Sequence, residues 1–204
     1  LETISVATEN MDANDSQGWS KQYTKGKPKL TSKIVTDGSS SDADKLGAIG
    51  DIRLVIGREE LMHDSLIVVA GDNLFSEPLA EFAQLAAGSA ATLATDDVGD
   101  LEVMKKYSAI KTDAEGVITH FEEKPEKPET TVTGIALYYF AAETLELFTT
   151  YIVAGNNPDQ PGRFIQWLHT RRPVKTYRVK GTWFYTGSEE TLEEAHQIFA
   201  PFAK

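Results

Sequence analysis

The chain has 204 residues, which is enough for one large domain or two small ones. Hydrophobic residues make up 41% and charged residues 25%, as in ordinary globular proteins, and no apolar stretch reaches the roughly 20 residues that a membrane span requires. The net charge of −11 argues against a nucleic-acid-binding surface, because neutralising phosphates needs clustered Lys and Arg. The absence of cysteine excludes disulfides and thiolate chemistry, and we expect a cytoplasmic protein without a membrane partner.

Apolar runs rich in β-branched and aromatic residues predict the strands. These runs lie at 3–8, 32–36, 65–71, 89–95 and 132–140. The run at 65–71, "SLIVVAG", is expected to form the most buried strand. Apolar side chains at intervals of three and four residues predict helices. These helices lie at 49–60, 79–86, 145–152 and 164–168, and a last one follows Ser188, whose hydroxyl suits an N-cap.

Three further segments interrupt this alternation of strands and helices. The segment 107–125 predicts a β-hairpin around "DAEG", where Gly116 supplies the turn. The polar, glycine- and serine-rich stretch 37–44 predicts a mobile loop. The cluster "EEKPEKPE" at 122–129 separates two strands too closely to divide domains. We therefore expect one α/β domain over residues 1–204, with a largely parallel sheet covered on both faces.

Asp72 follows the apolar run directly, within "AGDN". Ligands of open α/β sheets bind beyond the carboxyl ends of the strands, where a carboxylate can hold Mg²⁺ against phosphate oxygens. Alternatively, Asp72 caps the next turn and Gly71 allows the bend. An aspartate at a strand end is also typical of phosphoacceptor proteins, but those need further acids near the first strand, where "TISVATEN" offers only Glu9.

Two other motifs suit phosphate or sugar binding, and each also has a purely structural interpretation. "KLGAIGDI" places glycines before a predicted helix, whose N–H groups favour a phosphate or a base edge, although an ordinary strand-to-helix turn fits equally. "FEEKP" places acids beside Lys124 at a strand end, where an acid can bind a sugar hydroxyl and a lysine a phosphate. A charged hairpin exit on the surface has the same composition.

The order of the motifs is more specific than any one of them. "AGDN", "DLEVMKKYS", "DAEGVITHFEEKP", "TGIALYYF" and "GTWFYTG" follow one another along the chain. In this order they closely resemble the sugar-1-phosphate nucleotidylyltransferases, or nucleotide-sugar pyrophosphorylases. The resemblance implies a glycosyltransferase-A-like, Rossmann-like fold, a three-layer α/β/α sandwich around a mixed, mainly parallel sheet. It also implies a nucleotidyltransferase that joins a nucleoside triphosphate to a sugar 1-phosphate.

The resemblance assigns roles residue by residue. Asp72 would be the first ligand of Mg²⁺, and Lys124 would contact the sugar phosphate as the second catalytic residue. The expected substrate-binding residues are Gly47 near the base, Asn73, Glu123 on the sugar hydroxyls, Lys124, and Thr133 and Gly134 along the sugar pocket. The resemblance is compatible with a homo-oligomer. Neither the base nor the sugar is identified by it.

The chain departs from the family pattern at three places. The family opens with a first strand and a glycine-rich triphosphate loop, so we expect such a segment upstream of Leu1. Tyr185 in "WFYTG" occupies the position of a metal-binding acid, and a neutral phenol is a poor ligand for Mg²⁺. Ser108 replaces a glycine and adds a side chain beside the sugar.

These departures bear on catalysis. Loss of one metal ligand at a cost of roughly 3 kcal/mol slows a reaction on the order of 100-fold. We therefore expect residues 1–204 alone to be a poor catalyst. A non-catalytic homologue that binds sugar nucleotides or acts as a regulatory subunit is the alternative that Tyr185 motivates.

Overall fold

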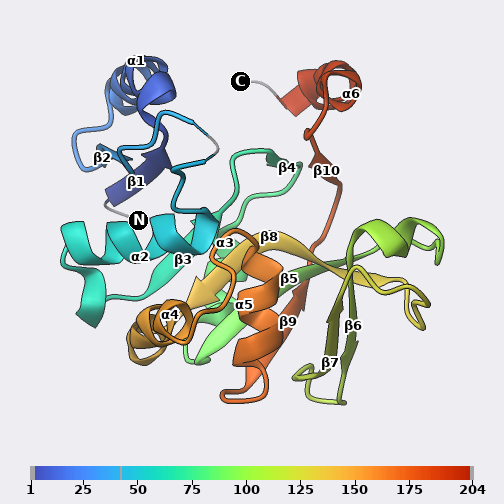
Figure 1. The fold of residues 1–204 in the computed structure, drawn as a ribbon. Helices are drawn as coiled ribbons and strands as arrows, with labels where there is room; N and C mark the ends of the chain where they lie inside the picture. Colours follow the sequence, from blue (N-terminus) through green and yellow to red (C-terminus); the bar gives the residue numbers. More distant parts are fainter. Residues whose placement is uncertain (1–2, 42, 203–204) are drawn as a thin grey trace. The chain divides into compact units, whose positions relative to one another are not determined.

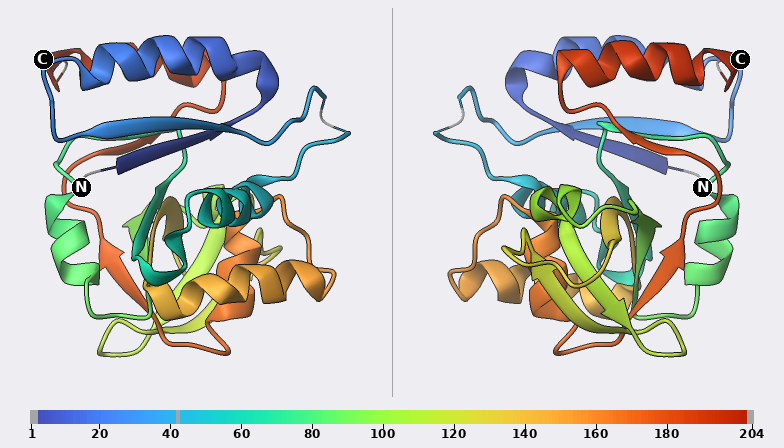
Figure 2. Two further views of the ribbon diagram at one scale, coloured as in Figure 1. Left: turned by 90° about the vertical axis from the view of Figure 1, so that its left-hand side faces the viewer. Right: turned by 90° about the vertical axis from the view of Figure 1, so that its right-hand side faces the viewer.

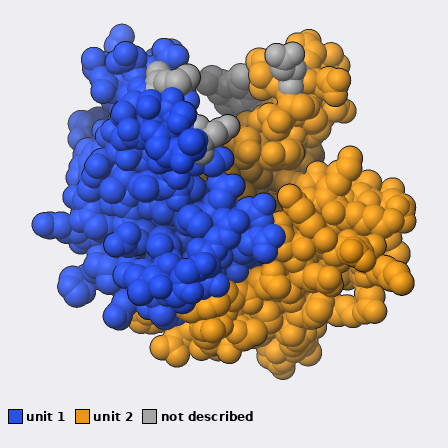
Figure 3. All heavy atoms as spheres, viewed as in Figure 1, with its two compact units in different colours: residues 1–63, 145–164 blue, residues 64–144, 165–204 orange. Residues whose placement is uncertain are grey.

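The computed structural model describes residues 3–41 and 43–202 (Figure 1). Contacts along the chain group it into two compact units, which Figure 3 colours separately. Unit 1 comprises residues 1–63 and 145–164, and unit 2 comprises residues 64–144 and 165–204. The single domain over 1–204 stays a prediction. In the described part of the chain, every helix is too short or too polar to span a lipid bilayer.

Unit 1 is built on two parallel strands. β1 (Thr3–Thr8) pairs in register with β2 (Thr31–Thr36), so the connection between them must cross over. That connection contains η1 (Asn10–Asp12) and α1 (Ala13–Thr24), and Figure 2 shows α1 lying along the strand pair. Two further elements follow, α2 (Ala48–Arg58) and η2 (Leu61–His63).

Unit 2 contains a four-stranded sheet in the order β3-β8-β5-β9. The strands are β3 (Leu66–Val69), β8 (Val132–Phe140), β5 (Ala91–Asp97) and β9 (Val174–Arg178). β8 runs antiparallel to both β3 and β5, whereas β9 runs parallel to β5. β3, β5 and β9 therefore share one direction and β8 alone is reversed, which makes the sheet mixed, as the family resemblance implied.

Two strand pairs complete unit 2. β4 (Asn73–Phe75) pairs antiparallel with β10 (Trp183–Tyr185), and β6 (Ser108–Thr112) pairs antiparallel with β7 (Ile118–Glu123). The second pair is the predicted hairpin, and its Gly116 has a positive φ of 76° that suits the turn. The remaining elements of this unit are α3 (Ala80–Ala86), η3 (Val103–Lys106), α6 (Glu189–Phe199) and η4 (Ala200–Phe202).

Two helices divide between the units, α4 (Ala142–Val153) and α5 (Pro161–Leu168). In unit 1, Phe148, Tyr151 and Phe164 form a buried aromatic cluster, in which the ring centroids of Phe148 and Phe164 are 4.2 Å apart. The core of unit 2 packs one face of β8 against α3 and β5. Its buried members are Phe82, Ala86, Ala94, Ile135, Leu137, Tyr139 and Ala141. Of the aromatic residues in the run 164–168, Phe164 is buried in the core, as expected, whereas Trp167 is only half-buried.

Several local expectations are confirmed. Ser188 caps α6: its side chain accepts a hydrogen bond from the backbone N–H of Thr191, and the Ser188 N–H donates in turn to the hydroxyl of Thr191. The predicted loop at 37–44 has no helix or strand in its described residues, and residue 42 lies outside them. Within this loop, Asp37 accepts hydrogen bonds from the backbone and hydroxyl of Ser39. The mobility of the loop stays a prediction.

Two expectations are wrong. β3 is not the most buried strand: among the described residues it pairs only with β8, and Val69 is 42% exposed. An apolar run does not reveal how many neighbours its strand has, and the buried positions belong to β5 and β8 instead. The helix expected at 49–60 begins at Ala48, so Gly50 lies in its first turn rather than before it. The sequence also did not predict α1, β4, β9 or β10.

Candidate functional site

Asp72 lies where the main sheet of unit 2 gives way to the β4–β10 pair. Beyond β3, the Ala70 N–H still donates to the carbonyl of Ala136 in β8, at 3.0 Å. Asp72 follows two residues later, and Asn73 opens β4, which pairs with β10. The carboxylate therefore stands at the carboxyl end of a sheet strand, as expected, where α/β proteins place their ligands.

Polar groups hold both the backbone and the side chain of Asp72. The backbone N–H and the hydroxyl of Thr186 both donate to the Asp72 carbonyl, at 2.8 and 3.0 Å. The side-chain amide of Asn73 donates to Oδ1 of Asp72 at 2.7 Å. Among the residues that the structure describes, Oδ2 of Asp72 has no hydrogen-bond partner. The carboxylate is thus fixed through one oxygen, and the other is available to a ligand.

The buried phenol of Tyr138 in β8 reports on the charges around this position. Burial raises the pKa of Tyr138, and the negative charges of Glu123 and Asp72 raise that pKa further. Two carboxylates from different elements therefore act on one buried hydroxyl.

Lys124 follows Glu123 at the end of the β6–β7 hairpin. It has a φ of 50°, in the left-handed region that side chains other than glycine rarely adopt. Its backbone N–H donates to the carbonyl of Tyr107 at 2.9 Å, which holds this conformation. Such backbone strain costs of order 1–3 kcal/mol and is concentrated at functional sites. The exposed Lys124 side chain is thus presented by a backbone that the hairpin constrains.

Thr133 and Gly134 lie in β8 against the start of the hairpin. Thr133 is fully buried, and the hydroxyl of Ser108 accepts a hydrogen bond from the Gly134 N–H at 3.1 Å. The Ser108 and Thr133 hydroxyls are 3.4 Å apart. A Cβ on Gly134 would lie 2.8 Å from Cδ2 of Leu93, so a larger residue there would have to displace the Leu93 side chain. The Ser108 hydroxyl thus occupies the backbone amide of Gly134.

Tyr185 lies opposite Asn73 in the β4–β10 pair. Its side chain is 43% exposed and covers Gly187, where a Cβ would lie 2.2 Å from the Tyr185 ring. The phenol is therefore turned over its own chain. In the described residues, no group of three acidic, His or Cys side chains could hold a metal ion. Asp72 alone still fits Mg²⁺, which usually keeps several waters and binds through one or two carboxylates plus substrate phosphates.

Gly47 belongs to unit 1, whereas all the other predicted site residues belong to unit 2. It precedes α2 with a φ of 76°, and a Cβ there would lie 2.8 Å from the Asp159 Cα. The N–H of Ile49, in the first turn of α2, donates to the Pro158 carbonyl at 2.8 Å. Backbone packing therefore already requires this glycine, and its contact with a base stays a prediction.

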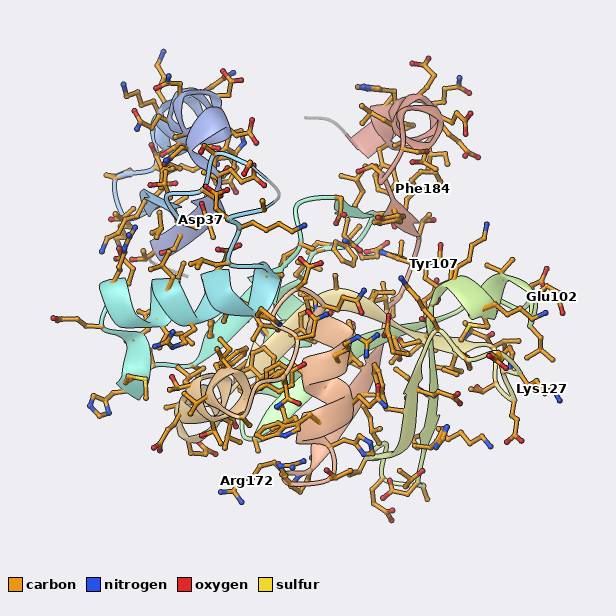
Figure 4. The ribbon with its side chains drawn as sticks, viewed as in Figure 1. Asp37, Glu102, Tyr107, Lys127, Arg172 and Phe184 are labelled. Atoms are coloured by element: carbon orange, nitrogen blue, oxygen red, sulfur yellow. The ribbon has the colours of Figure 1, made fainter. Side chains whose placement is uncertain are left out.

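Two aromatic residues at this site were missed. Trp183 donates its indole N–H to Oδ1 of Asn73 at 2.7 Å, and its ring meets the edge of Tyr107 at a centroid distance of 6.1 Å. Figure 4 labels Tyr107 in the segment that leads into β6. The available signal was the tryptophan between glycines in "GTWFYTG", because a part-buried indole needs a hydrogen-bond acceptor.

Comparison with known protein families shows which family the chain belongs to. The family model described as nucleotidyl transferase matches residues 2–200. The chain belongs to this family. Its members generally use a divalent metal ion, and the sequence resemblance to the sugar-1-phosphate nucleotidylyltransferases is confirmed.

Individual relatives of this nucleotidyl transferase are distant. It is 25% identical to a glucose-1-phosphate adenylyltransferase of Clostridium acetobutylicum over 136 residues, 64% of this chain and 36% of the relative. It is 23% identical to the bifunctional protein GlmU of Methanocaldococcus jannaschii over 175 residues, 86% of this chain and 39% of the relative. The chain thus spans little more than a third of these relatives.

Solved structures confirm the glycosyltransferase-A-like α/β fold of the chain. A UDP-glucose pyrophosphorylase complexed with UDP-glucose matches with a TM-score of 0.77 and 18% identity, over 99% of this chain and 82% of that one. A putative glucose-1-phosphate thymidylyltransferase from Bacillus anthracis, in complex with a sucrose, matches with a TM-score of 0.75 and 16% identity. That match covers 96% of this chain and 75% of the other.

Proposed function

We propose that the protein is a sugar-1-phosphate nucleotidylyltransferase. In this reaction an oxygen of the sugar phosphate attacks the α-phosphorus of a nucleoside triphosphate. The bond from the α-phosphorus to the bridging oxygen breaks, so that pyrophosphate leaves and a nucleoside diphosphate sugar remains. The observation that carries the proposal is the carboxylate of Asp72, fixed at a strand end by Asn73 with its Oδ2 unpartnered among the described residues. Membership of the nucleotidyl transferase family supports it.

The catalytic task of this chain is to place two mutually repelling anions together. Asp72 would hold Mg²⁺, which supplies charge neutralisation between the phosphate groups when it is bound. Lys124, on its constrained backbone, binds the sugar phosphate as a positive point charge. Glu123 accepts hydrogen bonds from the sugar hydroxyls, and the backbone of Thr133 and Gly134 bounds the sugar.

The hydrogen bond between Gly134 and Ser108 affects how the candidate site can recognise a sugar. Because the Ser108 hydroxyl accepts from the Gly134 N–H, that N–H is already engaged before a sugar binds. The Ser108 side chain also fills space that a glycine leaves open. We therefore expect the sugar to be recognised through Glu123 and Lys124 more than through the amide of Gly134.

The test is pyrophosphate release by the full-length protein. The protein is incubated with Mg²⁺ and with a panel of nucleoside triphosphates and sugar 1-phosphates, and release is followed for each pair. Release is expected for at least one pair, and its rate is expected to fall on the order of 100-fold in Asp72→Asn. The absence of release with every pair, together with measurable binding of a sugar nucleotide, would contradict the proposal and favour a non-catalytic binding or regulatory subunit.

That second candidate rests on Tyr185, whose phenol stands where a metal-binding acid is expected and is turned over Gly187. Restored release in Tyr185→Asp, from a protein that is otherwise silent, would identify the lost ligand as the cause. The cytoplasmic location and the homo-oligomer expected from the sequence stay predictions, as does the identity of the base and the sugar.

A further inference from the structure

The side-chain amide of Asn73 is engaged at both of its ends. Its Oδ1 accepts the indole N–H of Trp183 at 2.7 Å, and its Nδ2 donates to Oδ1 of Asp72 at 2.7 Å. An indole nitrogen can only donate and a carboxylate can only accept, so the amide fits between them in one orientation. The three side chains form a chain of hydrogen bonds that ends at the candidate ligand Asp72.

We propose that Trp183 and Asn73 are positioning residues that hold the Asp72 carboxylate in one orientation for a divalent cation. The terminal torsion of an aspartate is broad and roughly two-fold, so an unrestrained carboxylate samples many directions. A hydrogen bond to one oxygen removes this freedom and leaves the other oxygen for the ligand. This inference rests on the proposed function only for what Asp72 binds, because the chain of hydrogen bonds is a property of the protein itself.

The surroundings of the amide make the arrangement rigid. Asn73 is only 8% exposed, so its two bonds face little competition from water. Trp183 is braced by the edge of Tyr107 and packs against the core of unit 2. The Thr186 N–H and hydroxyl fix the Asp72 carbonyl from the same segment of chain. The β10 segment and the residue that follows it thus hold Asp72 at both its backbone and its carboxylate.

This assignment gives Asn73 a role different from direct substrate binding. Its acceptor oxygen and one of its two amide N–H groups already have partners within the protein. Trp183 acts through Asn73 and does not touch a ligand itself. Groups that orient a ligating carboxylate or imidazole in this way change metal affinity by 10- to 100-fold when they are removed.

The deciding variant is Trp183→Phe, which keeps an aromatic ring in the core and removes the indole N–H. Mn²⁺ binding to the full-length protein is measured by electron paramagnetic resonance, and the part of it that Asp72→Asn abolishes is taken as binding at Asp72. We expect affinity for Mn²⁺ to fall about 10-fold in Trp183→Phe. The matched control is Trp167→Phe, which removes an indole N–H from α5 and is expected to leave the affinity unchanged. Cooperative thermal unfolding of both variants shows that they are folded.

A second measurement does not depend on the folding of a variant. The chain has three tryptophans, so the indole N–H signal of Trp183 can be resolved in a ¹H–¹⁵N NMR spectrum of the wild type. Addition of Mg²⁺ is expected to shift this signal, and Asp72→Asn is expected to abolish the shift. A signal that does not respond to Mg²⁺ would overturn the proposal, as would wild-type Mn²⁺ affinity in a folded Trp183→Phe protein.

Different results would contradict the positioning role of Trp183 and the proposed function of the protein. Mn²⁺ binding that weakens in Trp183→Phe, in a protein that releases no pyrophosphate from any substrate pair, would support the positioning role and contradict the proposed function. Pyrophosphate release with Mn²⁺ affinity insensitive to Trp183→Phe would contradict the positioning role and leave the proposed function intact.

Discussion

Asp72 in unit 2 and Asp51 in unit 1 are carboxylates in opposite surroundings. Asp72 accepts a hydrogen bond from Asn73, and its backbone is held by Thr186. Asp51, in the first turn of α2, has a buried Oδ1 without a hydrogen-bond partner among the described residues. Burial raises the pKa of Asp51 to about 6, helped by the charges of Asp37 and Glu9. A carboxylate with a polar partner is prepared for a ligand, whereas one without a partner is a cost to the fold.

The largest effect is expected from Asp72→Asn. Removing the charge removes the carboxylate that would hold the metal ion, and we expect the rate of pyrophosphate release to fall on the order of 100-fold, or roughly 3 kcal/mol. The control is Glu122→Gln, an exposed acid in the same unit, which should change the rate less than two-fold. Equal activity of Asp72→Asn and the wild type would show that the Asp72 carboxylate is not needed for the reaction. The contrast with Asp51 would then have no functional meaning.

Tyr185→Asp adds a second carboxylate to the candidate site, opposite Asn73. We expect the rate to rise about 10-fold, or roughly 1.4 kcal/mol, because a second oxygen ligand strengthens metal binding. Tyr185→Phe is the matched control, since it keeps the ring over Gly187 and removes only the phenol oxygen. If Tyr185→Phe loses activity as severely as Asp72→Asn, the phenol has a role of its own at the site.

At Asp51 the expected effect is on stability. Asp51→Asn removes a partly buried charge. Among the described residues, Oδ1 of Asp51 has no hydrogen-bond partner. We expect the free energy of unfolding at pH 7 to rise by about 1 kcal/mol, after allowing for the screening of a group that is only partly buried. Urea denaturation measures the change, with the exposed Asp64→Asn as control. A destabilised Asp51→Asn protein would show that the carboxylate makes a favourable interaction.

The smallest expected effect is the pH dependence of the same free energy. Because the pKa of Asp51 is raised in the folded state to about 6, the folded state binds more protons than the unfolded state above pH 3.8. Asp51 therefore contributes its full stability below pH 3.8, and this contribution is lost as the pH rises through about 6. Between these values, stability should decline more steeply in the wild type than in Asp51→Asn. Parallel pH profiles would contradict the assigned environment of Asp51.

Local patterns were sufficient for elements whose side chains carry a clear period. The hairpin with Gly116 and the α6 N-cap at Ser188 depend on turn and cap chemistry within a few residues. α1 has no such signal, since "ANDSQGWSKQYT" is mostly polar and contains a glycine. The exposure of β3 depends on how many strands pair with it, which an apolar run does not encode.

The candidate site likewise has features that local sequence patterns predict and features that they do not. Asp72 and Lys124 follow strands in the sequence and Glu123 is the last residue of one, so their positions at strand ends could be predicted. The bond from Trp183 to Asn73 joins residues 110 positions apart, and no local pattern predicts it. The strained backbone of Lys124 likewise depends on the carbonyl of Tyr107, which the hairpin brings to it.

The most direct test is a crystal structure of the full-length protein with Mn²⁺ and a nucleotide sugar. The anomalous signal of Mn²⁺ locates the ion independently of the surrounding density. We predict that Mn²⁺ contacts the carboxylate of Asp72 and that the phosphates of the nucleotide sugar lie beside the ion. Mn²⁺ and phosphates bound together at another surface, with Asp72 contacting neither, would contradict it.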